Sequence, residues 1–285
     1  MKNLKILFLM VIGITANVSC TKTITQLSTD ESAIAAITTV DSTLQQNSKT
    51  KSDAVVPGKY IYLTIDDAPL NGSEYIDSVI LKAKVKTNIF MVGNPIHGSH
   101  KFERYHKLLK KNPFIELYNH SYSHANHRYA NYYKNPEQVV MDFEKNRTEF
   151  NLSSQIARLP GRNLWQIGER KKNYKQTGAE AAALLAEKGY KIFGWDVEWK
   201  YSSKDYSPQQ TIDELVEEIE NAYTAGSFTS NHVVLLMHDQ MFIKKTANND
   251  LGKLIEKLKE SGYTFEYLRS YPELTDIDPR ELSLR

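Results

Sequence analysis

The chain contains a single cysteine, Cys20, among its 285 residues. One cysteine cannot form an intramolecular disulfide, so the fold must be stabilised by its hydrophobic core alone. The net charge is also small, +2 from 36 basic and 34 acidic residues, and these charges are spread along the chain. Because no basic stripe and no nucleic-acid-binding motif is present, nucleic acid is not an expected partner.

The first 20 residues have the three-part layout of a secretory signal: basic MKNLK, apolar ILFLMVIGI and then TANVSC. The apolar run is too short to span a bilayer as a mature helix. Cys20 resembles the lipid-attachment cysteine of bacterial lipoproteins, although Asn17 stands where Leu is usual. We therefore expect a signal peptide at 1–19 and an exported protein, lipid-anchored through Cys20 to a membrane of the bacterial cell envelope. The alternative is an unpaired cysteine inside an ordinary signal peptide.

Aromatic residues are absent from residues 21–57, although the chain has 17 tyrosines. The segment is rich in Ser, Thr, Asp and Gln, so it has little apolar bulk to bury. We expect residues 20–57 to be a flexible, lipid-anchored tether and residues 58–285 to form one folded domain.

From Tyr60 onward, apolar β-branched runs alternate with segments of helical periodicity. Strands are predicted at 60–66, 87–92, 114–120, 155–160, 190–197, 232–239 and 263–268. Helices are predicted at 73–84, 101–112, 136–150, 178–189, 211–225 and 249–262. Strict alternation of strand and helix predicts an α/β fold with a parallel sheet, either closed as a barrel or open and doubly wound.

Ionisable residues stand at the carboxyl ends of five predicted strands. They are Asp66 and Asp67, His120, Arg158, Asp196 and Glu198, and His238 and Asp239. Each alone has an ordinary explanation, such as a helix N-cap or a solvated loop residue. In parallel α/β proteins, however, active sites are built at this edge from several strands. Five such strand ends together predict an active site.

The stretch IELYNHSYSHANH, residues 115–127, contains three of the eight histidines. A lone HxxxH match is weak, but two imidazoles and one carboxylate form a common three-ligand zinc set. His120, His124 and one of the aspartates at 66 and 67 supply that set, leaving the other aspartate as a base. With His238 as a proton donor, the constellation predicts metal-assisted hydrolysis of an acyl bond.

The motifs TIDDAP, HSYSH, RLPGR, WDVEW and LLMH follow one another at successive strand ends. Over roughly residues 58–270 this order resembles the polysaccharide deacetylase family. These carbohydrate esterases remove N-acetyl groups from chitin or peptidoglycan, or O-acetyl groups from xylan. The resemblance implies an irregular (β/α) barrel of about seven parallel strands.

The resemblance also implies the roles of the residues nearest the metal. Asp66 is the catalytic base, and Asp67 is the metal ligand beside His120 and His124. Arg158 orients the base. The implied cofactor is one divalent metal ion, zinc.

Further roles follow from the same resemblance. The backbone N–H of Gly161 helps to bind the oxyanion, and Trp199 and Leu236 line a pocket for the methyl group. His238 is the general acid, and Glu198 takes the place of the aspartate that tunes it.

Three positions depart from the family pattern. Ala68 and Arg162 stand where glycine is usual, and Glu198 stands for aspartate. Alanine is tolerable at 68 only if that position does not require positive φ. Arg162 brings a long cation close to the cleft.

The sequence thus predicts a metal-dependent hydrolase acting on an acetylated carbohydrate, with N-acetylated amino sugars as the favoured substrates. One alternative is an O-acetyl esterase of the xylan type. Another is a catalytically weak carbohydrate-binding lipoprotein on the same scaffold.

Overall fold

A computed structural model describes residues 58–243 and 249–272. The chain divides into two units, residues 1–53 and 54–285, and all the described residues belong to the second unit. The predicted signal peptide, Cys20 and the tether lie outside the described residues. Among the helices described, none combines the length and the apolar character needed to cross a membrane.

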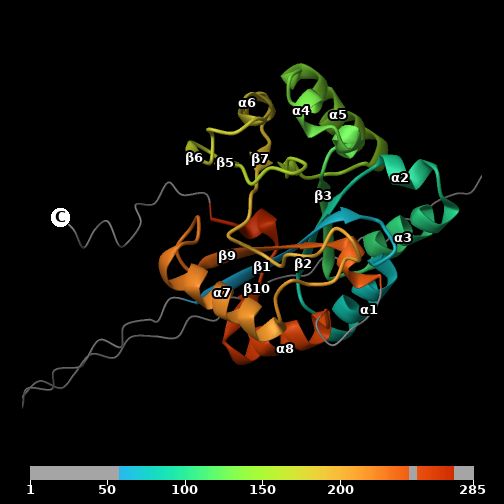
Figure 1. The fold of residues 1–285 in the computed structure, drawn as a ribbon. Helices are drawn as coiled ribbons and strands as arrows, with labels where there is room; N and C mark the ends of the chain where they lie inside the picture. Colours follow the sequence, from blue (N-terminus) through green and yellow to red (C-terminus); the bar gives the residue numbers. More distant parts are fainter. Residues whose placement is uncertain (1–57, 244–248, 273–285) are drawn as a thin grey trace, which may run out of the picture. The chain divides into compact units, whose positions relative to one another are not determined.

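Ten strands form one sheet, most of them parallel (Figure 1). They are β1 (Lys59–Ala68), β2 (Thr87–Met91), β3 (Ile115–Asn119), β4 (Ile156–Ala157), β5 (Trp165–Ile167), β6 (Arg170–Lys172), β7 (Lys191–Ile192), β8 (Val197–Glu198), β9 (His232–His238) and β10 (Tyr263–Phe265). The strand order is β6-β5-β7-β4-β3-β2-β1-β9-β8, with β10 also paired to β1. Only β5 pairs in the antiparallel sense, with β6 and with β7.

The connections between strands are mostly helical, as in other parallel sheets. The helices are α1 (Ser73–Ala83), α2 (Asn94–His97), α3 (His100–Lys111), α4 (Tyr129–Tyr132), α5 (Pro136–Phe150), α6 (Ala179–Glu187), α7 (Ile212–Ala225) and α8 (Leu251–Glu260). Short 3₁₀ turns span His124–His127, Asp239–Phe242 and Leu268–Ser270. Local sequence sets some of the helix starts: Thr211 and Glu214 form a capping box at α7, and the Ser99 side chain caps α3.

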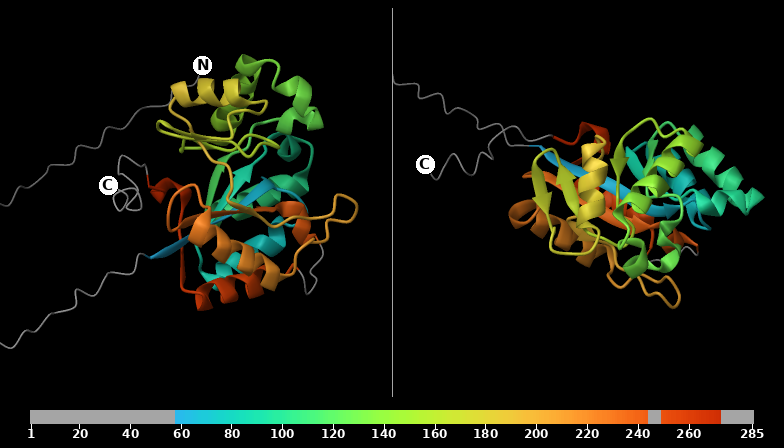
Figure 2. Two further views of the ribbon diagram at one scale, coloured as in Figure 1. Left: turned by 60° about the vertical axis from the view of Figure 1, so that its left-hand side comes forward. Right: turned by 90° about the horizontal axis from the view of Figure 1, so that it is seen from above.

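One segment joins two distant parts of the curled sheet. Its start, β7, pairs with β4, and its end, β8, pairs with β9. Between them, the Phe193 N–H donates to Ala157 O and the Asp196 N–H donates to Val234 O, both at 2.9 Å. A sequence run that reads as a single strand therefore turns across the sheet and closes the curl (Figure 2).

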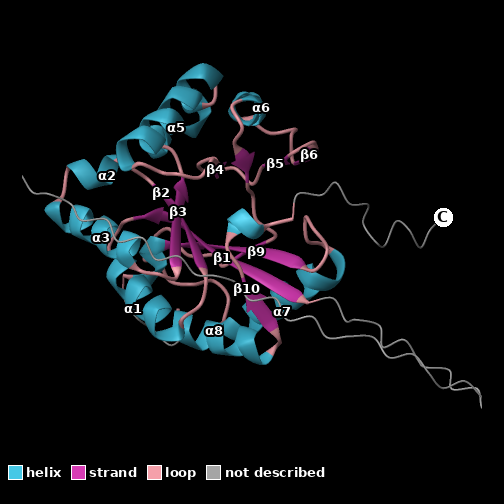
Figure 3. Ribbon diagram, turned by 180° about the vertical axis from the view of Figure 1, so that it is seen from behind, coloured by secondary structure: helices cyan, strands magenta, loops and turns pink. Residues whose placement is uncertain are grey.

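The alternation of β1 places its side chains in two different environments. Ile61, Leu63 and Ile65 pack outward in the main core, against residues of helices α1, α7 and α8. Tyr62 faces the interior of the curl, in a second core with Phe90, Trp165 and Phe193. Figure 3 shows the helices along the outside of β1, β9 and β10, so polar side chains can gather inside the curl.

The predicted irregular (β/α) barrel is confirmed as a strongly curled, mostly parallel half-barrel, and the predicted strands and helices match its main elements. Two differences have a local cause. The strand expected at 190–197 is divided between β7 and β8, because the chain there leaves one neighbour for another. The hairpin of β5 and β6 was not expected, because each strand is only three residues long.

Candidate metal centre and active site

The two adjacent aspartates at the end of β1 turn towards the same place because the strand is irregular there. The pairing of β1 with β2 shifts register between Asp66 and Ala68, and Asp67 has φ of 70°. In a regular strand the two side chains would point to opposite faces. The bulge instead brings both carboxylates close to His120: Asp66 Oδ2 lies 3.4 Å and Asp67 Oδ1 3.7 Å from its Nε2.

Asp67, His120 and His124 form a group with metal-ligand chemistry. One potential ligand atom from each lies within 4.8 Å of the others. Asp67 Oδ1 is 3.0 Å from His124 Nε2, and it is buried without a hydrogen bond of normal geometry. Two imidazole nitrogens and one carboxylate oxygen suit a divalent ion such as zinc. The residues present therefore fit a metal.

The orientation of His120 is fixed by its second nitrogen. His120 Nδ1 lies 2.8 Å from the backbone oxygen of Arg158, and the side chain is 2% exposed. A carbonyl can only accept, so Nδ1 carries the proton and the lone pair of Nε2 is free for a metal.

The electrostatics of the group favour an ionised carboxylate. Burial would raise the pKa of Asp67, but the hydrogen bond and charge of His124, with the charges of His120 and His238, hold it well below its usual range. Burial lowers the pKa of His120, against the opposing charge of Asp66. For His124, burial acts in the same direction, but Asp67 outweighs it and raises the pKa.

Arg158 is fully buried and binds Asp66 directly. Its NH1 donates to Asp66 Oδ1 and to Thr64 Oγ1, both at 2.8 Å. Its Nε donates to Phe193 O at 3.2 Å and its NH2 to Gly194 O at 2.7 Å. The guanidinium thus satisfies its donors while fixing one oxygen of Asp66, which leaves the other facing His120.

On the opposite side, His238 ends β9 directly beside Asp66 in the strand register. Its ring packs edge-on against Tyr201, with centroids 5.0 Å apart. His238 Nδ1 is buried and has no hydrogen-bond partner in the described part of the chain.

The comparisons with known proteins agree with this geometry. The family model for polysaccharide deacetylase matches residues 53–158. YheN of Bacillus subtilis, whose name assigns it to the same family, is 26% identical over 217 residues, which is 74% of this chain and 67% of YheN. By both comparisons, the chain is similar to members of the polysaccharide deacetylase family.

Solved structures of this family show the same fold. The catalytic domain of the peptidoglycan N-acetylglucosamine deacetylase from Eubacterium rectale superposes with a TM-score of 0.54 and 24% identity, over 80% of this chain and 98% of that one. A pseudoenzyme of the same carbohydrate esterase family, CE4, from Bacillus anthracis superposes with a TM-score of 0.50 and 19% identity, over 73% and 63%. Similarity to this family therefore does not by itself establish turnover.

Trp199 and Glu198 do not have the surroundings that the family resemblance implies. Trp199 is fully buried in the core between sheet and helices, and its indole N–H donates to Gln210 O at 3.4 Å. The expectation that Trp199 lines the methyl pocket is not supported by these contacts, because its side chain, directly after β8, packs in the same core as Val197 rather than inside the curl. Glu198 alternates with it and faces inward beside Leu236, yet no hydrogen bond joins Glu198 to His238.

The other departures from the family pattern are accommodated locally. Ala68 is fully buried and does not have positive φ, since the left-handed residue is its neighbour Asp67. Arg162 binds Thr177 through Nε and NH2 and lies over the ring of Tyr133 at 4.8 Å. Alanine thus fits at 68, and Arg162 is held by the chain itself.

Gly161 has φ of 65°, and a Cβ there would lie 3.2 Å from the Tyr129 ring, so both backbone and space favour glycine. Its N–H makes no hydrogen bond within the described residues, which leaves it available as a donor.

Sequence reasoning missed one polar neighbour of the metal group. Gln240 Nε2 donates to Asp67 Oδ2 at 3.1 Å and lies 3.5 Å from the hydroxyl of Tyr201. Its position two residues after His238 was the only available signal.

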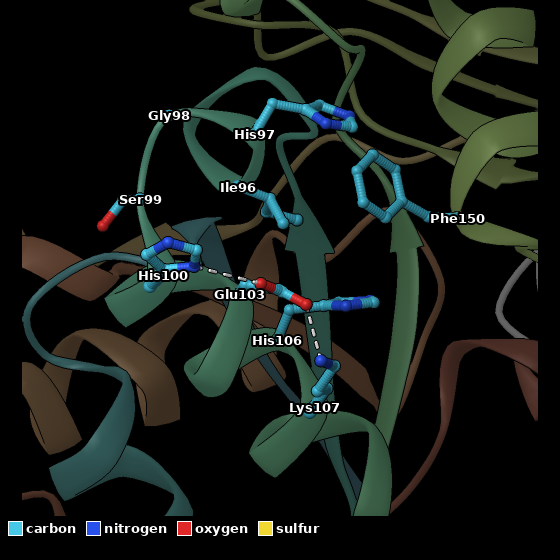
Figure 4. A pocket seen from close by; sticks show the side chains of 9 residues that line it. All are labelled: Ile96, His97, Gly98, Ser99, His100, Glu103, His106, Lys107 and Phe150. Carbon is cyan, nitrogen blue, oxygen red and sulfur yellow. Dashed lines mark hydrogen bonds and ion pairs between the residues drawn. The ribbon is translucent and has the colours of Figure 1, made fainter.

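The remaining histidines of the helical region do not form a second metal group. His97, His100 and His106 line a separate cavity of about 430 Å³ (Figure 4). Phe150 packs against both His97 and His106, with centroids 5.7 and 5.2 Å away, so their nitrogens do not converge. Among the described residues, only Asp67, His120 and His124 form a metal-ligand group. His127 is exposed beside His124 and is not a member of it.

Proposed function

We propose that the protein is a zinc-dependent deacetylase that removes N-acetyl groups from the amino sugars of a chitin- or peptidoglycan-like carbohydrate. The observation that carries the proposal is the convergence of Asp67, His120 and His124 next to Asp66, which is itself held by Arg158. A metal group alone suits many proteins. A second carboxylate, fixed beside it by a buried arginine, suits hydrolysis.

The roles of the side chains follow from their surroundings. A divalent ion held by Asp67, His120 and His124 would act as a Lewis acid and lower the pKa of water. Asp66 takes the proton of the attacking water, because Arg158 binds only one of its oxygens and leaves the other available.

Two further groups, the Gly161 N–H and His238, would act on the substrate. The Gly161 N–H donates to the oxyanion that develops as the acetyl carbonyl is attacked. His238 gives a proton to the departing amine, and its place beside Asp66 in the strand register brings acid and base close together.

Acetate release is the direct test. Oligomers of N-acetylglucosamine and acetylated xylan are each incubated with the protein, with added zinc and with a chelator. We expect zinc-dependent release from the amino-sugar oligomers. Release from xylan alone would assign the protein to the O-acetyl esterases instead, and zinc-independent release from either would contradict the metal mechanism.

A second candidate is carbohydrate binding with little turnover. It is supported by the unpartnered Nδ1 of His238, which Glu198 does not reach, and by the existence of a CE4 pseudoenzyme. Binding of the oligomers without acetate release would favour this candidate. If instead the protein hydrolyses an activated acetyl ester but not the oligomers, the acid rather than the metal is deficient, since such leaving groups need no proton.

We also propose that the protein is exported and anchored to a bacterial envelope membrane by a lipid on Cys20. The basic start, short apolar run and single cysteine of the sequence support this. Labelling with a radioactive fatty acid in the producing cell is the test. A Cys20→Ser variant should lose the label and leave the membrane fraction, whereas equal labelling of both proteins would refute the anchor.

A further inference from the structure

The ligand loop, residues 121–127, has an unusual backbone. Positive φ angles occur at five non-glycine residues: Ser121 (67°), His124 (49°), Ala125 (56°), Asn126 (45°) and His127 (58°). Non-glycine residues seldom adopt this region, although asparagine, aspartate and histidine do so more often than others, and a run of such conformations persists only where surrounding contacts hold it. The local sequence therefore does not by itself hold His124 in its place beside Asp67.

A carboxylate from the neighbouring helix α5 holds the middle of this region. Asp142 Oδ2 accepts from the Ser123 N–H at 3.1 Å, from the Ser123 hydroxyl at 2.9 Å and from the Tyr132 hydroxyl at 2.9 Å. The Asp142 carbonyl also accepts from the Tyr122 N–H at 3.3 Å. Asp142 thus binds two consecutive residues of the loop, Tyr122 and Ser123, and also Tyr132 at the end of α4.

Two other residues of α5 contact the same region from the same face of the helix, at spacings of three and four. Lys145 Nζ lies 3.3 Å from the centroid of the Tyr122 ring. Asn146 is fully buried and donates to Asn119 Oδ1 at 2.9 Å, the same oxygen that accepts the Ser121 N–H at 3.0 Å. Gly93 allows this close packing of the loop on α5, since a Cβ there would come within 2.7 Å of Asn146, Phe150 and Tyr122.

We propose that Asp142 is a positioning residue for the metal centre, which fixes the ligand loop so that His124 Nε2 meets Asp67 before any metal binds. Asp142 does not touch the metal group itself. It acts through Ser123, which directly precedes His124 in the chain, and through Tyr132, whose hydroxyl it binds. Asn146 supports the start of the loop in the same way. The contacts with α5 offset the conformational free energy of the left-handed backbone, so the site is formed before metal binds.

Two measurements on the purified protein test this role. The first is amide hydrogen exchange of residues 121–128 without metal, in which Asp142→Ala should speed exchange about tenfold or more, as expected for a loop released into local opening. The second is zinc affinity by competition with a chromogenic chelator, in which Asp142→Ala should bind about 10- to 100-fold more weakly, the usual cost of losing an outer-shell partner. Asp142→Asn keeps one acceptor and should fall between Asp142→Ala and the unsubstituted protein in both.

The matched control is Glu144→Ala. Glu144 is a half-buried acid on the same helix, and it binds Arg147 rather than the loop. It should leave both measurements unchanged, which separates positioning from a general loss of helix stability. A folded Asp142→Ala protein with unchanged loop exchange and zinc affinity within about twofold would overturn the proposal.

If Asp142→Ala does not fold, the pair Ser123→Ala and Tyr132→Phe removes both side-chain donors to Asp142 and leaves Asp142 and the Ser123 N–H in place. The combined variant should show faster loop exchange, and unchanged exchange in it would equally overturn the role. This role depends on the proposed function only for the zinc measurement. If the unsubstituted protein binds no zinc, the proposed function fails, while loop exchange still decides whether Asp142 holds the loop.

Discussion

Strands β1, β2, β3 and β9 are five to ten residues long, whereas β4, β7 and β8, which complete the curl, have two residues each. The long-strand half consists of β1, β2, β3 and β9, with the ligand loop after β3. It carries the predicted metal ligands and also the proposed base, Asp66, and the proposed acid, His238. The short-strand half (β4, β7 and β8, with their connections) carries Arg158, Gly161 and Glu198. The long-strand half supplies the reacting side chains, whereas the short-strand half supplies supporting groups: Arg158 holds the base, and the Gly161 N–H is proposed to bind the oxyanion.

The difference has a physical reason. Long parallel strands fix the position of their ends through many ladder hydrogen bonds. Short strands cannot, and in the second half a side chain substitutes for the ladder: Arg158 donates to the carbonyls of Phe193 and Gly194, where the chain crosses between β7 and β8. Changes in the long-strand half should therefore cost chemistry with the fold intact, and changes in the short-strand half should cost stability.

The largest effect is expected for the metal ligands themselves. The double variant His120→Ala/His124→Ala should lose its zinc, measured by elemental analysis of the purified protein, and its acetate release should fall to the level of chelator-treated enzyme. Its circular dichroism should remain that of a folded protein. Retention of the full metal content would show that the metal is bound elsewhere.

The next largest effect separates the adjacent aspartates. Asp66→Asn should keep the metal and lose about 10² to 10⁴ in turnover, the usual contribution of a positioned acid–base group. Asp67→Asn should instead weaken metal binding, and excess zinc should restore part of its activity. The comparison needs zinc affinity and initial rates for both proteins. If Asp66→Asn lost the metal and Asp67→Asn kept it, their roles would have to be exchanged.

In the short-strand half, Arg158→Met should lower the free energy of unfolding by about 3–5 kcal/mol, because Asp66 is left as a buried charge without its partner. Denaturant unfolding measures this loss, with the free energy of unfolding extrapolated to zero denaturant. Adding Asp66→Asn removes the orphaned charge, so the double variant should regain much of the loss. If the two substitutions were simply additive, Arg158 would stabilise the fold through Phe193 and Gly194 alone.

The same contrast explains what the sequence could predict. In the long-strand half, β-branched runs predicted the strands and the parallel sheet, and the histidine spacing with the strand-end acids predicted a metal group of His120, His124 and one of the two aspartates. Only the family resemblance chose Asp67. The bulge at Asp67 was not predictable from the pattern, because it depends on the register of β1 against β2. In the short-strand half, Trp199 and Glu198 were expected on the substrate side, but Trp199, the residue after β8, packs in the outer core and only Glu198 faces inward. Gln240 and Asp142 were not foreseen because their contacts are tertiary.

The smallest effect is expected at Glu198, which the family pattern would make a partner of the general acid. Its carboxylate makes no hydrogen bond to His238, whose Nδ1 has no partner among the described residues. Loss of a true outer-shell partner usually costs about 10- to 100-fold. Glu198→Gln should therefore reduce acetate release less than about tenfold, at the lower edge of that range. Initial rates across pH measure both the size of the loss and any change in the acid-dependent limb.

Glu217→Gln is the matched control, because Glu217 is an exposed glutamate on α7. The Glu217→Gln variant measures the effect on acetate release of removing one negative charge away from the site. If Glu198→Gln lost about a hundredfold and shifted the pH profile while Glu217→Gln did neither, Glu198 would reach His238 when substrate is bound. The short-strand half would then supply a group that acts directly on the acid, and the division between reacting and supporting halves would fail at that position.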